Sequence, residues 1–407
     1  MTTLNSVLRF SWMRYPVLLL FFLFTGNRQQ AFEKSEQERL LEMDLTFMYQ
    51  PVVSFHPGYV EYMEGELDRI LGQRRFNGTV LVAHKGKAVY NKSFGLSHVP
   101  SQRPFESRNN TFQLASVGKQ FTAVAVLMLA EQGLLRLDDP VALHLEGFPH
   151  EDITVRHLLN HTSGLQNYMY LLDNRWKQER LPGLEDLMRI MQPMPLNFRP
   201  GSRFAYSNTG YGFLALLVEQ ISGQSFASFV HDHIFVPAGM KHSFVFAPHM
   251  NLDSLHAQGV AAGHERQGRG MRVIPADHVD GISGDKGIFA SAEDLLRWDN
   301  ALEMNLLISE ESKMEAFSHG RLRSGYAISY GFGYRLRRHE GDIIPYHNGW
   351  WRGFRTTYVR MPDNTLIVIL NNTNASINGL DRQIWNIVSR SPWPRFGEEE
   401  WLLAAHP

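Results

Sequence analysis

Residues 78–84 read Gly-Thr-Val-Leu-Val-Ala-His and are followed, after a glycine turn, by the strand-like residues 87–94. Two such runs around a glycine turn predict a β-hairpin. Near the other end of the chain, residues 355–360 and 365–370 flank a Pro-Asp-Asn turn and predict a second strand pair. We therefore expect one antiparallel sheet built from both ends of the chain.

Helical spacing of apolar residues marks the segments around these strands. It predicts a first helix from Pro57 to about Arg75 and a strongly apolar helix from Ser116 to Gln132. Further helices are expected over residues 208–221, 292–302 and 377–389. The predicted fold class is α+β, with an antiparallel sheet flanked by helices and a helical lobe from about residues 135 to 310. We expect the site in the cleft between sheet and lobe.

Composition excludes several classes of function. The 407 residues carry a formal net charge of -1 and contain no cysteine. The near-neutral charge gives no electrostatic reason to expect a nucleic-acid partner. The absence of cysteine excludes disulfides, thiol nucleophiles and thiolate metal sites.

The N-terminus is typical of an exported protein. Arg9 and Arg14 precede a short apolar run, residues 17–24, which is the layout of a secretory signal. Phe24 makes a poor cleavage site, so an uncleaved anchor in the inner membrane is the alternative to a periplasmic or extracellular protein. We divide the chain into a signal peptide or anchor (1–26), a polar linker (27–56) and one catalytic domain (57–395).

The motif Ser116-Val-Gly-Lys119 opens the predicted apolar helix. Residues three apart share a helix face, so the Lys119 ammonium can reach the Ser116 hydroxyl. A serine needs a nearby base to act as a nucleophile, and burial lowers a lysine pKa so that it can serve. The free N–H groups at the helix start can stabilise an oxyanion. Taken alone, the motif fits a capping serine beside an exposed lysine better.

A second motif, Tyr206-Ser-Asn208, lies in a loop that enters a helix. A tyrosine held near a lysine ammonium ionises more easily and can act as a general base. The Asn208 amide can hold Lys119 and contact a substrate amide. The alternative is a plain helix start, in which Asn208 caps and Tyr206 packs.

The third motif is His347-Asn-Gly349, which we place just before the C-terminal strand pair. Gly349 would allow a substrate to approach a strand edge closely. The backbone N–H of Trp350 would then be a second oxyanion donor. A histidine in an ordinary turn is the alternative interpretation.

These three motifs, in this order, resemble the family of serine β-lactamases and penicillin-binding proteins. The closer similarity is to the branch with a Tyr-x-Asn motif, which includes class C β-lactamases, D-alanyl-D-alanine carboxypeptidases, D-aminopeptidases and carboxylesterases. The segments 153–165, 284–289 and 353–354 look like the same family. The resemblance covers about residues 58 to 390 and implies a β-lactamase/transpeptidase-like fold.

The resemblance also implies roles. Ser116 would be the acylated nucleophile, Lys119 its proton partner and Tyr206 the base that assists acylation and deacylation. Listed by role, substrate contacts would come from Asn208, His347 and Gly349, and the oxyanion hole from the amides of Ser116 and Trp350. The implied enzyme needs no cofactor and acts on a small molecule or peptide, with a cell-wall muropeptide among the candidates; we expect a monomer.

One departure narrows the expected substrate. The third motif of β-lactamases usually begins with lysine, whereas this chain has His347. A neutral imidazole binds a substrate carboxylate less strongly than a permanent cation does. This favours a D-alanyl-D-alanine carboxypeptidase, D-peptidase or esterase, with a β-lactamase as one alternative. The alternative of another class is a non-catalytic penicillin-binding sensor of the cell wall.

Two other hydrolase classes fit less well. His157 and His161 lie four residues apart, and His231-Asp-His233 is a short cluster, but the glutamate that a zincin needs between its histidines is absent. We therefore expect no metal. An α/β-hydrolase requires Gly-x-Ser-x-Gly, and the segment starting at Gly281 lacks the final glycine.

Overall fold

The computed structural model describes residues 53–106, 110–192 and 194–396. The predicted signal or anchor, residues 1–26, lies outside the described residues, as does most of the predicted linker. The catalytic-domain segment therefore supplies nearly all of the structure described below.

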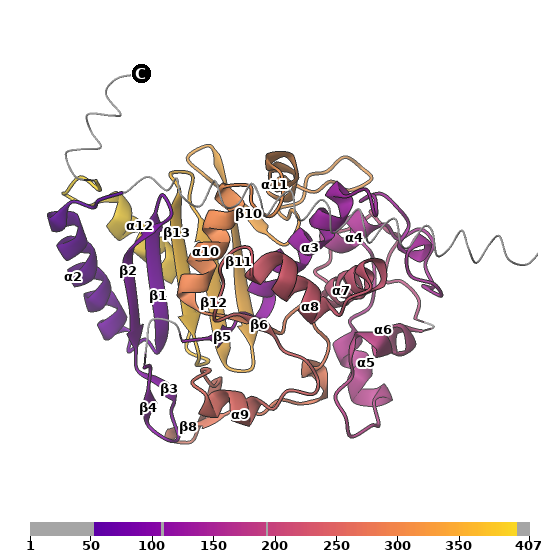
Figure 1. Ribbon diagram of the computed structural model, residues 1–407, viewed down its shortest axis with the longest axis horizontal. Coiled ribbons are helices and arrows are strands. Elements are labelled where there is room, and N and C mark those ends of the chain that lie inside the picture. Colours follow the sequence, from indigo (N-terminus) through magenta and orange to yellow (C-terminus); the bar gives the residue numbers. More distant parts are fainter. Residues whose placement is uncertain (1–52, 107–109, 193, 397–407) are drawn as a thin grey trace, which may run out of the picture. The chain divides into compact units, whose positions relative to one another are not determined.

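A six-stranded antiparallel sheet forms the centre of the domain (Figure 1). In spatial order its strands are β10 (Arg335–His339), β11 (Asp342–Trp351), β12 (Phe354–Arg360), β13 (Thr365–Asn371), β1 (Gly78–His84) and β2 (Lys87–Phe94). β1 pairs with β13 along its whole length, with Val80 opposite Ile369. The predicted sheet built from both ends of the chain is thereby confirmed.

Helices cover both faces of this sheet. The helices α2 (Pro57–Gln73) and α12 (Leu380–Ser389) pack on one face in a core that includes Val80 and Val82. Side chains alternate along a strand, so Leu81 points to the opposite face. There α10 (Ala292–Glu303) contacts β1, β2 and β13, and it lies in front of the strands in Figure 1.

The helical part contains the elements that lead into the site. Its central contact is between α3 (Lys119–Glu131) and α7 (Asn208–Ser222). Gly223, with a φ of 72°, ends α7 in the left-handed conformation. The other helices are α4 (Val155–Leu159), α5 (Tyr168–Arg175), α6 (Leu184–Met191), α8 (Phe226–Val230), α9 (Leu252–Ala257) and α11 (Glu310–Ala316).

Short elements complete the chain. The 3-10 turns are η1 (Ala115–Gly118), η2 (Val141–Leu143) and η4 (His278–Asp280), and η3 (His231–Phe235) is a π-helical turn. The short strands are β3 (Leu96–His98), β4 (Arg103–Pro104), β5 (Phe112–Gln113), β6 (Phe244–Val245), β7 (His264–Gln267), β8 (Gly270–Val273) and β9 (Ile288–Ala290).

The structure corrects the predicted elements at three places. The predicted helix from Ser116 begins with the 3-10 turn η1, and α-helical geometry starts only at Lys119. The last helix begins at Leu380 and not at Ile377, because Gly379 adopts a left-handed φ of 72°. His347-Asn-Gly349 lies inside β11, because residues 346–351 pair with β12. The hairpin that β10 forms with the first half of β11 was not predicted.

No single helix of the described ranges is long and apolar enough to cross a membrane. The bent pair α7 and Phe226–Phe235 passes that test together by length and composition. Tyr211, Phe213 and Leu217 of α7 are nevertheless fully buried within the protein.

The packing of α2 on the sheet gives a stability prediction. Leu67 is completely buried between this helix and the strands, so Leu67→Ala should lower the free energy of unfolding by about 2–5 kcal/mol. Glu61→Ala on the exposed side of the same helix should change it by less than about 0.5 kcal/mol. Urea denaturation of both variants measures the difference, and equal stabilities would contradict this packing.

Candidate active site

Ser116 is presented on the turn η1 between the sheet and α3. The preceding Ala115 has a φ of 51°, a left-handed conformation that costs an L-residue roughly 1–2 kcal/mol. The neighbouring backbone holds this turn in place: Leu114 N–H donates to Ile288 O at 2.8 Å, and Leu114 O accepts from Thr356 Oγ1 at 2.7 Å. The serine is therefore fixed from two sides.

Lys119 lies one helical turn after the serine and is completely buried. Its Nζ donates to three oxygens: Ser116 Oγ at 3.2 Å, Asn208 Oδ1 at 2.9 Å and Asp285 O at 2.6 Å. Burial lowers the Lys119 pKa to about 7; the negative charge of Asp285 opposes this shift and the positive charge of Arg335 adds to it. The alternative interpretation, an exposed lysine beside a capping serine, is thus wrong.

Tyr206 stands beside this lysine on the loop before α7. Lys119 Nζ lies 5.0 Å from the centre of the Tyr206 ring, and the Arg335 guanidinium lies 5.2 Å from it on β10. The Tyr206 hydroxyl is buried and forms no hydrogen bond with the described residues. Burial raises its pKa above the ordinary value; the nearby Ser116 hydroxyl and the positive charge of Arg335 oppose this shift, and the negative charge of Asp285 adds to it. This differs from the predicted easily ionised tyrosine.

The start of α7 leaves Asn208 available for the site. Ser207 is the capping residue, and its hydroxyl accepts from Gly210 N–H at 3.2 Å. The Asn208 side chain therefore reaches Lys119 and does not serve as the helix cap. The structure brings together all four residues of the first two motifs.

His347 is placed differently from the prediction. Its side chain is completely buried and is not among those that line the active-site cavity. Nε2 is 3.0 Å from the Tyr330 hydroxyl and Nδ1 is 2.8 Å from Asn348 O. Burial holds its pKa well below the ordinary value, helped by the charges of Lys119 and Arg335. The imidazole therefore faces the protein interior, whereas the predicted substrate contact requires a side chain that faces the cavity.

One edge of β11 is open next to the serine. β10 pairs only with residues 342–346, so residues 347–351 pair with β12 on one side and with no described strand on the other. Gly349 allows a close approach here, because a Cβ at this position would collide with Leu114 O and Thr356 Oγ1. Gly349 and Trp350 line the same cavity as Ser116. This arrangement suits the predicted oxyanion hole.

The cavity has a volume of about 1050 Å³ and joins the first two motifs to the sheet. Ser116, Tyr206 and Asn208 line it together with Arg335, a residue that sequence reasoning missed. Arg335 belongs to no motif, and only the β10–β11 hairpin brings it next to Tyr206. It supplies the permanent cation that the third motif lacks.

A buried polar cluster supports the lysine from behind. Asp285, whose carbonyl accepts from Lys119, is buried, and its carboxylate accepts from the Tyr168 hydroxyl at 3.2 Å. Lys286 Nζ donates to the Tyr168 hydroxyl at 2.5 Å. Thr122 Oγ1 of α3 donates to Gly284 O at 2.7 Å. The segment 284–289 therefore positions α3 and its lysine.

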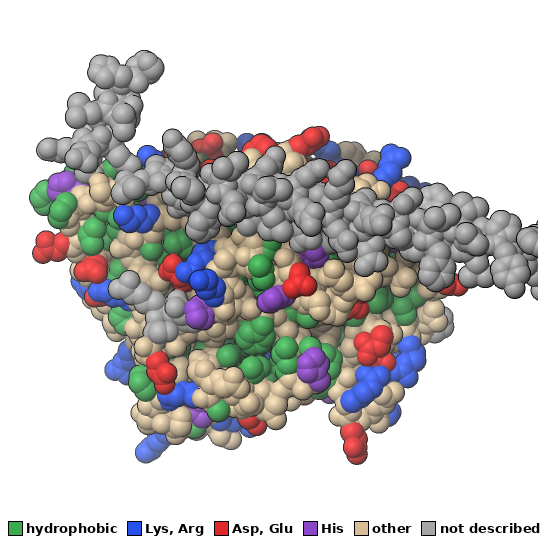
Figure 2. All heavy atoms as spheres, viewed as in Figure 1, with side chains coloured by type: hydrophobic (Ala, Val, Ile, Leu, Met, Phe, Trp, Pro, Cys, Tyr) green, Lys and Arg blue, Asp and Glu red, His purple; other side chains and the backbone are tan. Residues whose placement is uncertain are grey.

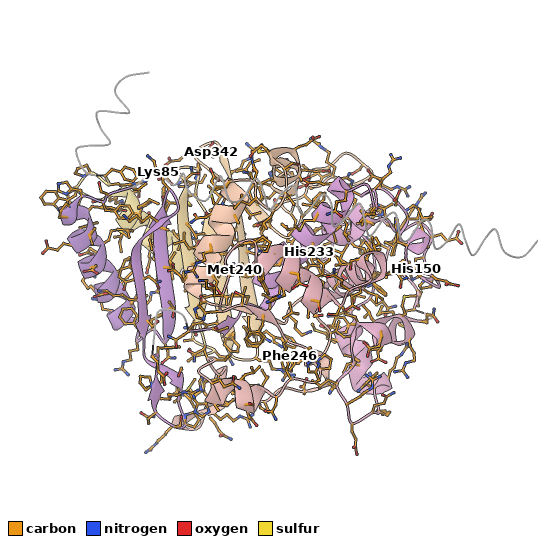
Figure 3. The ribbon with its side chains drawn as sticks, viewed as in Figure 1. Lys85, His150, His233, Met240, Phe246 and Asp342 are labelled. Carbon is orange, nitrogen blue, oxygen red and sulfur yellow. The ribbon has the colours of Figure 1, made fainter. Side chains whose placement is uncertain are left out.

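The histidines weighed as metal ligands lie in separate surroundings. His157 Nδ1 accepts from Thr154 N–H at 3.1 Å, and His161 Nδ1 accepts from Ser207 N–H at 3.1 Å. His233 on the turn η3, labelled in Figure 3, lies with its ring centre 4.5 Å from that of Phe229, and the two rings are tilted by 45°. Across residues 53–106, 110–192 and 194–396, no group of three or more His, Asp or Glu side chains is arranged to hold a metal ion.

Comparisons with known proteins identify the family and agree with the fold. Residues 61–388 match the family model described as Beta-lactamase. Penicillin-binding protein 4* of Bacillus subtilis is 37% identical over 316 residues, which cover 74% of this chain and 69% of that protein. A D-aminopeptidase of Brucella anthropi is 28% identical over 306 residues, covering 72% of this chain and 55% of that protein. The crystal structure of a penicillin-binding protein from Bacillus halodurans has a TM-score of 0.66 and 26% identity, covering 79% of this chain and 97% of that one.

The close approach at Gly349 is testable. Gly349→Ala should lower the free energy of unfolding by about 1–3 kcal/mol, because the added methyl group displaces either Leu114 or Thr356. Gly270→Ala is the matched control, since the nearest atom to its new Cβ would be 3.9 Å away. Thermal and urea unfolding compare the two variants. If Gly349→Ala is as stable as the control, Gly349 of β11 does not contact Leu114 and Thr356 as closely as described.

Proposed function

The chain belongs to the beta-lactamase family, a family of serine hydrolases, and from that premise we propose that it forms an acyl-enzyme at Ser116. One observation carries this proposal. Ser116 Oγ lies 3.2 Å from the amine of a completely buried lysine whose pKa is lowered to about 7. A large fraction of such lysines is neutral at pH 7 and is able to accept a proton.

In the proposed acylation, neutral Lys119 accepts the Ser116 hydroxyl proton as Oγ attacks the substrate carbonyl. The backbone N–H groups of Ser116 and Trp350 stabilise the oxyanion that forms. The leaving amine or alcohol takes a proton from the Tyr206 hydroxyl, which recovers one from Lys119. The tyrosine thus relays a proton as a neutral phenol, which suits its raised pKa.

Deacylation runs in the reverse sense. Water loses a proton through Tyr206 to Lys119 and attacks the acyl-enzyme, and the released Ser116 oxygen takes that proton back. Asn208 holds Lys119 throughout, through the 2.9 Å hydrogen bond from Nζ to its Oδ1. The same side chain lines the cavity, where it can contact a substrate amide.

We propose a D-peptide or an ester as the substrate class. The relatives include proteins named penicillin-binding protein and D-aminopeptidase, which supports a carbonyl next to a D-residue. The open edge of residues 347–351 can pair with an extended substrate. Arg335 can bind a substrate carboxylate in place of the buried His347.

Export is a separate proposal and rests on the N-terminal sequence alone. The basic start and apolar run within residues 1–26 support transfer across the inner membrane, with an uncleaved anchor as the alternative. A muropeptide substrate would fit that location. Comparing the mass of the secreted or membrane-bound protein with the full chain decides between cleavage and anchoring.

Covalent labelling tests the nucleophile. A fluorescent penicillin or a fluorophosphonate should label the wild type and Ser202→Ala, and it should not label Ser116→Ala. Ser202 is a suitable control because its hydroxyl is exposed and bonded to Arg199 O at 2.6 Å. Equal labelling of Ser116→Ala would exclude this nucleophile. A labelled protein that hydrolyses no D-peptide, ester or β-lactam would be the penicillin-binding sensor.

The lysine pKa also predicts a pH profile. The fraction of Lys119 that is neutral increases as pH rises through its pKa. The kcat/KM for a neutral ester should therefore rise with an apparent pKa of about 7 and then level off. A rate that is independent of pH between 5 and 9 would contradict Lys119 as the base.

Tyr206→Phe should lower kcat by at least about 100-fold, because the proton relay is broken. Tyr326→Phe, at an exposed position, is the control.

A further inference from the structure

The active-site cavity continues from the serine to the start of α12. Arg335 lies against the Tyr206 ring, whereas Arg337, two residues further along β10, pairs with Asp381 of α12 at 2.8 Å. Both arginines line the same cavity as Ser116. The recess is therefore longer than the catalytic residues require.

Arginines dominate the side of this recess that faces the sheet and α12. We call this side the arginine groove; its members are Arg335, Arg337, Arg338, Arg355 and Arg382. The only carboxylate among the described lining residues is Asp381, which forms an ion pair with Arg337. The whole chain has a net charge of -1, so this excess of positive charge is local. On the face drawn in Figure 2, by contrast, acidic and basic side chains are mixed.

The groove cations are available to a ligand. Arg335, Arg338 and Arg382 form no ion pair with any other described residue. Arg355 donates only a 3.3 Å hydrogen bond to Asn374 O and lies 4.8 Å from the centre of the Trp350 ring. Trp350 is 66% exposed and offers an aromatic wall next to these charges. Several unpaired cations in one recess attract anions more strongly than the same charges spread over a surface.

Guanidinium groups bind carboxylate and phosphate oxygens in a two-point geometry. Arg335 alone can satisfy a single carboxylate near the reacting carbonyl. Arg355 lies on β12 opposite Trp350. Arg382 lies on α12 next to Asp381, the partner of Arg337. A substrate with one charge leaves both of these cations, Arg355 and Arg382, without an anionic partner. A ligand complementary to the whole groove carries additional anionic groups beyond the carbonyl.

From this juxtaposition of Ser116 with the arginine groove, we propose that the enzyme selects acyl substrates bearing two or more carboxylate or phosphate groups beyond the reacting carbonyl. This rests on the proposed function, because it specifies the substrate of the same serine. The additional anions bind Arg355 and Arg382, and the reacting carbonyl is thereby directed to Ser116.

Binding can be tested without turnover in a Ser116→Ala background. The two ligands are a tri-glutamate peptide, for the carboxylate source, and inorganic tripolyphosphate, for the phosphate source; a tri-glutamine peptide is the neutral reference. Titration calorimetry at low salt should show binding of at least one anion, weakened about tenfold or more by the double change Arg355→Gln and Arg382→Gln. The anion that binds more tightly shows whether the groove prefers carboxylate or phosphate groups.

The matched control removes the same charge elsewhere. Arg266 and Arg269 are exposed in the β7–β8 hairpin and do not line the cavity. Changing both to Gln should alter the dissociation constant by less than about twofold, as expected for distant, screened charges. If neither anion binds, or if both double variants weaken binding equally, the groove is not an anion site.

A kinetic comparison separates this proposal from the proposed function. A D-alanyl ester with a neutral tail is compared with the same ester extended by three glutamates. The ratio of their kcat/KM values should favour the charged ester and fall about tenfold in the groove variant. No hydrolysis of either ester, with anion binding intact, would overturn the proposed function and leave the groove assigned. An unchanged ratio would overturn selection by the groove.

Discussion

The burial of the Lys119 amine is the constraint on which the site depends. A charged ammonium without water is unfavourable, so the protein supplies three oxygens from three segments: Ser116, Asn208 and the Asp285 carbonyl. Each of those segments must be held in place for the lysine to be buried. The same burial lowers the lysine pKa to about 7 and makes the amine useful as a base. Stability is given up at this point, and reactivity is gained.

The sheet and the helical part meet at the serine turn. Leu114 joins them, since its N–H bonds to Ile288 and its carbonyl to Thr356 of β12. The glycine at position 349 lets β11 come close enough for its open edge to form one wall of the cavity. Because a packed interior has few voids, a restraint on one of these segments also restrains its neighbours. The positive φ of Ala115 is therefore maintained by contacts on both sides.

Local sequence patterns predicted the parts of this structure that local rules govern. The hairpin of residues 78–94, the end of α7 at Gly223 and the proximity of Ser116 to Lys119 follow from turn chemistry and helical spacing. The order of the three motifs matched a known family, and this resemblance predicted the fold and the proximity of Tyr206 and Asn208 to Lys119.

What the sequence could not show depends on tertiary burial. Three of the five residues of β10 are arginines, and β11 contains Pro345 and Gly349, so neither segment shows the apolar alternation of a strand. Their hairpin was therefore missed, and with it Arg335. His347 is an ordinary polar residue in the sequence, and its inward orientation follows from its place in β11, where its Nε2 meets the Tyr330 hydroxyl. The raised pKa of Tyr206 likewise follows from its surroundings.

The charge of Lys119 is the most direct test of this account. Lysine side chains labelled with carbon-13 at Cε can be titrated by NMR in the full-length protein, with Lys119→Met assigning the resonance. The structure predicts a midpoint of about 7 for this one lysine. A midpoint near the ordinary lysine value of about 10.4 would show that the amine stays charged at neutral pH, and it would contradict Lys119 as the base that activates Ser116.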